Sequence, residues 1–162
     1  MDFINQCLEW FKSLFSGGAE PQTPMQGVLA AIRENITVPL GLPEAMTTAL
    51  AAQSSLETAH WASGVYRATN SLFNRHVGSG KGYWTGTSYY ANPGDPNLRV
   101  YTDISQSARD MAELLQDPLY REALQNLKQG SATGYFRAVA AAGFAATPHY
   151  AEAVNVVYES IA

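Results

Sequence analysis

The 162-residue chain is poor in cysteine and histidine, with one Cys and three His. A single cysteine, Cys7, excludes an intramolecular disulfide and a metal site built from several thiolates. Lysine and arginine are few and form no run, and the net charge is −4, so we expect no nucleic-acid partner. No apolar stretch is long enough to cross a bilayer. The composition is that of a globular domain, with aromatic residues to pack a core or line a groove.

The first 26 residues predict two segments apart from the main domain. Apolar residues recur every three or four positions over 1–16, which predicts an amphipathic helix. We expect residues 1–15 to pack or dock on protein, with a membrane surface as the alternative partner. Residues 17–26 are rich in Gly and Pro and predict a flexible linker. Residues 27–162 then form one domain.

The pattern of residues 27–162 predicts a mainly α domain with one small β hairpin. Apolar spacing favours helices at 27–35, 43–60, 105–115, 118–128, 130–142 and from 148 to the end. Aromatic and Thr-rich residues 82–90 and the alternating residues 98–102 flank a turn-forming segment at 91–97. We expect residues 61–82 to be a long connection and Asp103 to cap the helix that follows the hairpin.

Glu57 lies on the inner stripe of the predicted helix 43–60, near its C-terminal end. The negative end of the helix dipole and partial burial both favour the protonated carboxyl group. A carboxyl group that keeps its proton near neutral pH is suited to act as a general acid. The alternative is a solvated glutamate at the edge of the apolar stripe.

Glu57 and His60 form an E-x-x-H pair, which is one half of some di-metal sites. Such a site needs a second pair and further carboxylates, which the chain lacks, so we expect neither a metal nor another cofactor. Cys7, on the apolar face of the first helix, is interpreted as a core thiol and not as a nucleophile.

Three blocks in a fixed order carry a resemblance. They are AQSSLETAHWASGVYRATNSLFN (52–74), LRVYTDISQSARDMAELLQDPLY (98–120) and AGFAATPHYAEAV (142–154). Together they resemble the glucosaminidase domains of the flagellar-muramidase type, glycoside hydrolase family 73. The resemblance implies a lysozyme-like α+β fold, in which a helical bundle-like body and a small β hairpin lobe flank a cleft. It also implies an endo-β-N-acetylglucosaminidase that cuts the GlcNAc-β-1,4-MurNAc bond of peptidoglycan glycan strands, with Glu57 as the general acid.

The resemblance and the aromatic hairpin together give candidate substrate contacts. These are His60, Asn70, Phe73, Trp84, Tyr89, Tyr90, Phe144 and Tyr150. Tyr89 and Tyr90 alternate along a strand, so at most one of them faces the cleft. His60 either orients Glu57, contacts sugar, or is a plain helix-end histidine.

The chain departs from the family pattern at several points. Phe144 replaces a Tyr, Ala146 replaces an Asp, Asn74 replaces a Gly, and residues 83–102 contain no Glu. With one clear acid, several routes stay open: water positioned by hydroxyl groups, a nucleophilic acetamido group of the substrate, or a lytic transglycosylase. A muramidase using the same glutamate, and a non-catalytic glycan-binding or structural virion protein, are further alternatives.

The start of the chain also bears on delivery. Residues 1–15 have neither a basic beginning nor a small-residue cleavage site, so we expect no signal peptide. An enzyme of this kind acts at the cell wall or in the periplasm. We therefore expect delivery by a phage virion, by phage lysis or by a secretion apparatus.

Overall fold

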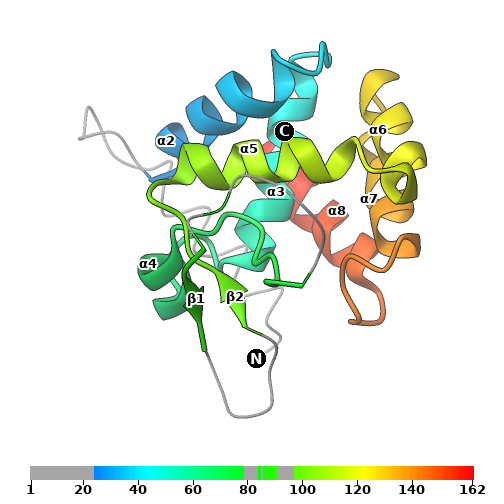
Figure 1. Cartoon of the computed structure of the whole chain (residues 1–162). Coiled ribbons are helices and arrows are strands. Elements are labelled where there is room, and N and C mark those ends of the chain that lie inside the picture. Colours follow the sequence, from blue (N-terminus) through cyan, green and yellow to red (C-terminus); the bar gives the residue numbers. More distant parts are fainter. Residues whose placement is uncertain (1–23, 79–83, 85, 91–96) are drawn as a thin grey trace, which may run out of the picture.

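The computed structural model describes residues 24–78, 84, 86–90 and 97–162 (Figure 1). The predicted helix 1–16 and most of the predicted linker 17–26 lie outside these ranges. Helix α2 (Pro24–Ile32) begins three residues before the predicted domain boundary at residue 27. It continues into a π-helical turn, η1 (Arg33–Thr37), which buries Ile36 in the core.

Helix α3 (Ala45–Glu57) runs through the middle of the domain, where its residues Met46, Ala49 and Leu50 are almost fully buried. The chain then forms α4 (Gly64–Thr69), α5 (Ile104–Leu115), the 3-10 turn η2 (Pro118–Tyr120), α6 (Arg121–Lys128), α7 (Ala132–Ala141) and α8 (Tyr150–Ile161). Helix α8 packs on α3 and α7, and α7 packs on α6.

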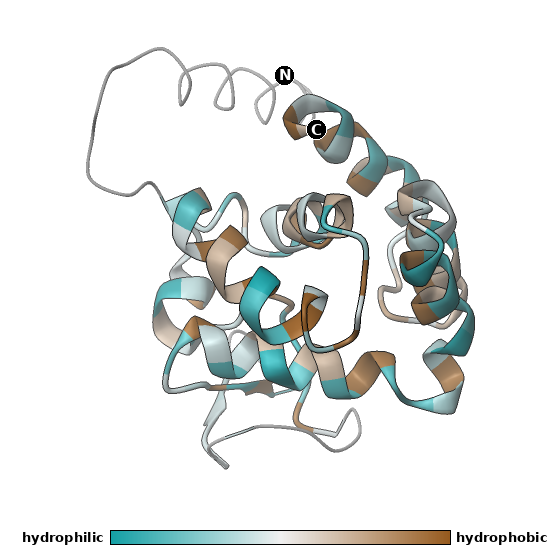
Figure 2. Ribbon diagram, turned by 90° about the horizontal axis from the view of Figure 1, so that it is seen from above, coloured by the Kyte–Doolittle hydropathy of each residue, from teal (hydrophilic) through white to brown (hydrophobic). Residues whose placement is uncertain are grey.

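Helices α5 to α8 are amphipathic, whereas α3 is buried on nearly every side, and Figure 2 shows hydrophobic and hydrophilic residues alternating along the helices. Their apolar sides share one core, centred on α3. Within the described ranges, no helix has both the length and the apolar character needed to cross a membrane.

A small antiparallel sheet pairs β1 (Ser88–Tyr89) with β2 (Leu98–Arg99), so the predicted hairpin is confirmed in a shorter form. Residues 91–96 of its predicted turn lie outside the described residues. The backbone in and after the second strand also bonds to the end of α4 and to the chain that follows it: Arg99 N donates to Arg75 O, and Tyr101 N to Thr69 O. In Figure 1, the sheet and α4 occupy one side of the molecule, and α6 and α7 the other.

The predicted helix 43–60 ends early, at Glu57, because the next residues form a left-handed turn. Ala59, His60 and Trp61 have φ values of 48°, 58° and 59°. Thr58 holds this turn: its hydroxyl donates to Ser54 O over 2.7 Å and accepts from Trp61 N over 2.9 Å. The turn places Glu57 at the last helical position, where its side chain leaves the core.

Helix α4 was not predicted, since residues 61–82 were expected to be a connection. Its signal is local: Ser63 is the N-cap, and its side chain accepts from Tyr66 N over 3.0 Å. The other helices follow the prediction within a few residues. Asp103 caps α5, with its carboxylate accepting from Gln106 N over 2.8 Å, as predicted.

Candidate active site

Glu57 lies in a surface groove of about 470 Å³ between the helical body and the β lobe. Its side chain is half-buried at the C-terminal end of α3. The groove is lined by Glu57, Phe73, Asn74, Arg75, His76, Leu98, Leu114, Tyr120, Gly143, Phe144, Ala145 and Ala146. Glu57 is the one carboxylate among these lining residues.

A chain of hydrogen bonds leads from Glu57 into the core. The Tyr150 hydroxyl donates to Glu57 Oε1 over 2.7 Å, and Gln53 Nε2 donates to the Tyr150 hydroxyl over 3.1 Å. The Tyr135 hydroxyl donates in turn to Gln53 Oε1. Burial raises the pKa of Glu57 from its usual 4.5 to about 7, and the bond from Tyr150 opposes this increase. Glu57 is therefore a group that can hold and release a proton near neutral pH.

Asn74 also bonds to Glu57, through the backbone. Its side-chain Nδ2 donates to the backbone carbonyl of Glu57, one of the carbonyls that the end of α3 leaves without a helical partner. Asn74 has φ of 45°, a conformation that glycine adopts freely and asparagine tolerates best among other residues. At the position where the resemblance has a glycine, this chain thus has an asparagine in the left-handed conformation, whose side chain adds a bond to α3.

A buried ionic cluster holds the groove wall in place. Asp110 of α5 is fully buried and pairs with Arg75 Nη1 at 3.1 Å and with Arg99 Nη1 at 2.6 Å. Tyr101 donates its hydroxyl to the same carboxylate over 2.6 Å. Since Arg75 lines the groove and Arg99 belongs to β2, the cluster ties both to α5. The second sequence block thus supplies three of the four residues of this cluster, Arg99, Tyr101 and Asp110.

The comparisons with known proteins decide the family. Residues 43–162 match the model of the glucosaminidase family, described as mannosyl-glycoprotein endo-beta-N-acetylglucosaminidase. The chain belongs to this family. Glucosaminidases are glycoside hydrolases, which agrees with a half-buried acid in an open groove.

Two solved structures are similar to this glucosaminidase domain. One is a peptidoglycan hydrolase from Sphingomonas sp. A1, with 26% identity, a TM-score of 0.58 and coverage of 81% of each chain. The other is the catalytic domain of the autolysin Auto from Listeria monocytogenes. It shares 17% identity and a TM-score of 0.60 over 94% of this chain and 93% of that one, and it shows the fold alone. No curated protein matches the sequence significantly.

The structure of this glucosaminidase brings three predicted contacts to Glu57. Phe73 and Phe144 line the groove beside it, and Tyr150 bonds to its carboxylate. The Phe144 ring lies 6.5 Å from the ring of Tyr120 and 6.3 Å from that of Tyr150, so three aromatic side chains meet at this end of the groove. Tyr120 was not predicted as a site residue.

Tyr89 and Tyr90 differ in their surroundings. Tyr89 pairs with Leu98, and directly opposed residues of a sheet share a face. Leu98 lines the groove, so Tyr89 stands on that side, whereas Tyr90 is 58% exposed. Trp84 donates its indole N–H to Thr87 O over 2.8 Å, and the Arg99 guanidinium lies 5.3 Å from its ring centre.

His60 and Asn70 have structural partners and are absent from the groove lining. His60 Nδ1 lies 2.6 Å from Ser55 Oγ, and burial lowers the pKa of its ring, which favours the neutral form. Asn70 ends α4 with φ of 51°, and its side-chain amide donates to Tyr101 O over 3.0 Å. Their predicted contacts with substrate stay predictions.

Sequence reasoning missed Gln53, Asn74, Arg75 and Tyr135 as parts of the site. Gln53 had a signal, since it falls on the same helical stripe as Glu57 and belongs to the first block. Tyr135 lies outside the three blocks and had none. In the ranges that the structure describes, no three His, Cys, Asp or Glu residues gather as metal ligands would.

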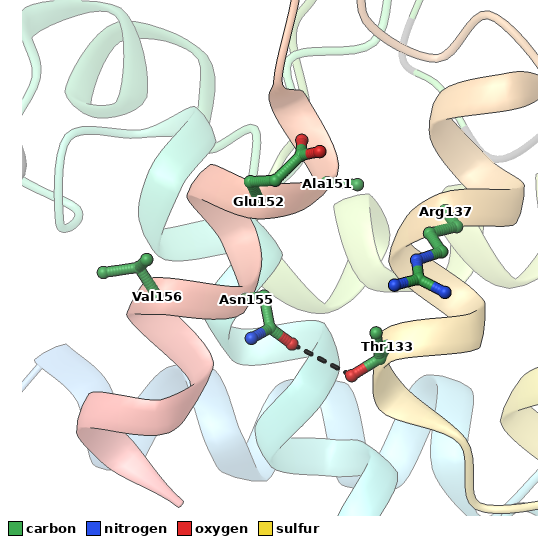
Figure 3. A pocket seen from close by; sticks show the side chains of 6 residues that line it. All are labelled: Thr133, Arg137, Ala151, Glu152, Asn155 and Val156. Carbon is green, nitrogen blue, oxygen red and sulfur yellow. Dashed lines mark hydrogen bonds between the residues drawn. The ribbon is translucent and has the colours of Figure 1, made fainter.

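A second hollow, of about 240 Å³, lies between α7 and α8 (Figure 3). It shares no lining residue with the groove of Glu57. Thr133 of α7 donates to Asn155 Oδ1 of α8 over 3.0 Å and bridges the two helices. Its one acid, Glu152, is exposed, so this hollow lacks the half-buried carboxyl group of the first groove.

Proposed function

We propose that this glucosaminidase cuts the glycan backbone of peptidoglycan at the GlcNAc-β-1,4-MurNAc bond, with Glu57 as the general acid. The observation that carries the proposal is the state of Glu57: a half-buried carboxyl group in an open groove, with a pKa of about 7. Near neutral pH a large share of such groups is protonated, and each can give its proton to the glycosidic oxygen as the bond breaks.

The groove suits a polysaccharide. The half-buried ring of Phe144 offers apolar surface against which a sugar ring packs, and the buried rings of Phe73 and Tyr120 line the same groove. The peptidoglycan substrate is supported by the hydrolase from Sphingomonas sp. A1, which is 26% identical over 81% of the chain. The three sequence blocks support it in the same way.

A lytic transglycosylase is the second candidate, and the carboxylate content of the groove favours it. Glu57 is the one acid among the described lining residues, and Ala146 stands where the family pattern has an Asp. A single glutamate is enough for that reaction, in which it acts first as acid and then as base while the sugar's own 6-hydroxyl replaces water.

Digestion of purified peptidoglycan separates these functions. Wild type, Glu57→Gln and the control Glu113→Gln, an exposed acid of α5, are incubated with walls, and the products are reduced with borohydride and read by mass spectrometry. Reduced GlcNAc at the new ends supports the proposal, reduced MurNAc indicates a muramidase, and unreducible 1,6-anhydro ends indicate the transglycosylase. Glu57→Gln is expected to be inactive and Glu113→Gln active.

Two results contradict the proposal. If wild type binds walls from several sources without releasing fragments, the domain is a glycan-binding or structural module. A high-mannose glycopeptide, tested in parallel, covers the substrate class that the family description names. Cleavage of that glycopeptide with no action on peptidoglycan would mean that the substrate is the glycan of a glycoprotein.

A further inference from the structure

Gln53 and Tyr135 lie behind the acid, where substrate has no access. Both side chains are fully buried, Gln53 on α3 and Tyr135 on α7. They are joined to Glu57 through Tyr150 by the three successive hydrogen bonds described above. Neither residue lines the groove.

This chain of hydrogen bonds has a direction, because each hydroxyl has one hydrogen and the Gln53 amide has a donor end and an acceptor end. In the observed direction, every bond donates toward Glu57. In the reverse direction, Tyr150 would donate to Gln53, and Gln53 would donate to Tyr135. The hydrogen of the Tyr135 hydroxyl would then need another acceptor.

The surroundings of Tyr135 select the observed direction. Over the described residues, the Tyr135 hydroxyl makes its one hydrogen bond to Gln53, and the side chain has no exposed surface where water would serve instead. A buried hydroxyl without an acceptor is costly, so reversal of the chain is unfavourable. The orientation is thus fixed at the end farthest from the groove.

We propose that Tyr135 and Gln53 are positioning residues that keep the Tyr150 hydroxyl aimed at Glu57 Oε1, so that the acidic proton of Glu57 stays on Oε2. This inference rests on the proposed function, in which Glu57 is the acid. Because Oε1 already accepts a hydrogen bond from the Tyr150 hydroxyl, the carboxyl group carries the proton that the substrate receives on its other oxygen.

The proposal makes two substitutions act in opposite directions. In Tyr135→Phe the amide of Gln53 is released and its oxygen competes with Glu57 for the hydrogen of Tyr150. The carboxylate loses part of a stabilising bond, so the pKa of Glu57 rises. Gln53→Met, added to Tyr135→Phe, removes the competing oxygen while keeping a side chain of similar length. Tyr150 then donates to Glu57 again.

The test is a titration of the Glu57 carboxyl carbon by ¹³C NMR, with its resonance assigned from its loss in Glu57→Gln. Four chains are compared: wild type, Tyr135→Phe, the Tyr135→Phe/Gln53→Met double variant and the control Tyr158→Phe. Tyr158 is a half-buried tyrosine of α8 whose ring packs on Phe136, so its variant also removes a hydroxyl group near α7.

Other titratable or charged groups also face Glu57 or share its groove, and every sample must keep them constant. They are Tyr150 of α8, Tyr120 of η2, and Arg75 and His76 after α4. All four chains retain these groups, so their effect is common to the four titrations. Tyr135 of α7 also interacts with Glu57, and two of the chains lose its hydroxyl, but burial raises its pKa so far that it stays neutral throughout the titration.

We expect Tyr135→Phe to raise the pKa of Glu57 by about 0.5 to 1 unit, the double variant to return it most of the way, and Tyr158→Phe to leave it unchanged. An unchanged or lowered pKa in Tyr135→Phe, or a double variant shifted further than the single one, overturns the proposal. If Tyr135→Phe acted only through lost packing, adding Gln53→Met would add to its effect, and the pKa of Glu57 would not return toward the wild-type value.

Wild type supplies a second measurement that does not depend on a variant folding. The amide protons of Gln53 should give stronger NMR cross-relaxation to the ring of Tyr150 than to that of Tyr135. The opposite pattern overturns the proposal. Neither measurement uses activity, so a failed peptidoglycan digestion refutes the proposed function alone.

Discussion

The hydroxyl of Tyr150 donates a hydrogen bond to Glu57 Oε1 over 2.7 Å, although 93 positions separate the two residues in sequence. Tyr150 is the first residue of α8 and Glu57 the last of α3, so the bond joins the start of one packed helix to the end of the other. The same bond lowers the pKa of the carboxyl group against the rise that burial causes.

Tyr150→Phe tests what that bond contributes. Without the donor, the ionised carboxylate is less stable, so the pKa of Glu57 should rise above about 7 by about 1 unit. A general acid works in its protonated form, so the alkaline limb of the activity profile should move to higher pH, while kcat falls about tenfold at the optimum. Rates of peptidoglycan solubilisation from pH 4 to 9 measure both.

Tyr158→Phe is the matched control for Tyr150→Phe, since it removes a hydroxyl group from the same helix. It should leave the pH profile in place. A Tyr150→Phe variant that loses rate equally at all pH values would mean that Tyr150 acts by packing and not by its bond to Glu57.

Glu57 also makes the stability of the domain depend on pH. Its pKa is about 7 when folded and near 4.5 otherwise, so ionisation penalises the folded state. This destabilisation is absent below pH 4.5, grows as the pH rises from 4.5 to about 7, and is complete above pH 7. Glu57→Gln does not titrate and should gain stability relative to wild type, by about 3 kcal/mol, between pH 4 and pH 8.

Urea denaturation of the two chains at pH 4 and pH 8 measures this difference. Glu113→Gln, which removes an exposed acid from α5, serves as the control and should show no comparable change. If the stability difference between Glu57→Gln and wild type is no larger at pH 8 than at pH 4, the carboxyl group of Glu57 is solvated.

The left-handed turn after Glu57 predicts a stabilising substitution. Ala59 has φ of 48°, where a Cβ atom is unfavourable and glycine is not. Ala59→Gly should therefore stabilise the domain by about 1 kcal/mol, less the extra entropy of glycine in the unfolded chain. Ala62→Gly, at an exposed position outside the left-handed region, should give no gain. Thermal unfolding of both variants checks this, and a lower melting temperature for Ala59→Gly would contradict it.

Sequence reasoning located the acid because helix periodicity is local. Glu57 and Gln53 occupy one stripe of α3, and the dipole and burial arguments follow from that position. The end of the helix was predicted three residues late because Ala59, His60 and Trp61 carry no glycine to mark a left-handed turn.

The partners of the acid are set by tertiary packing, which periodicity does not show. Tyr150 was proposed as a contact through the resemblance alone, and Tyr135 had no signal, because its role depends on α7 packing beside α8 and α3. Arg99, Tyr101 and Asp110 belonged to a recognised block, yet their pairing inside the groove wall appears only in three dimensions.

The buried cluster around Asp110 should be the most sensitive site in the domain for stability. Asp110→Asn keeps the shape of the side chain but removes the negative charge that pairs with both of the buried residues Arg75 and Arg99. Breaking a buried ion pair by removing one partner costs about 3–5 kcal/mol. The exposed pair between Arg33 and Glu44, 2.9 Å apart, is the contrast: Arg33→Gln should cost under about 1 kcal/mol.

Urea denaturation at neutral pH compares the two variants directly. Because Arg75 lines the groove and Arg99 lies in β2, partial unfolding of Asp110→Asn should begin in the β lobe. Amide exchange at Arg99 and Tyr101 should then accelerate more than exchange in α7. Equal costs for the two variants, or exchange that accelerates uniformly, would show that the Asp110 cluster does not hold the groove wall.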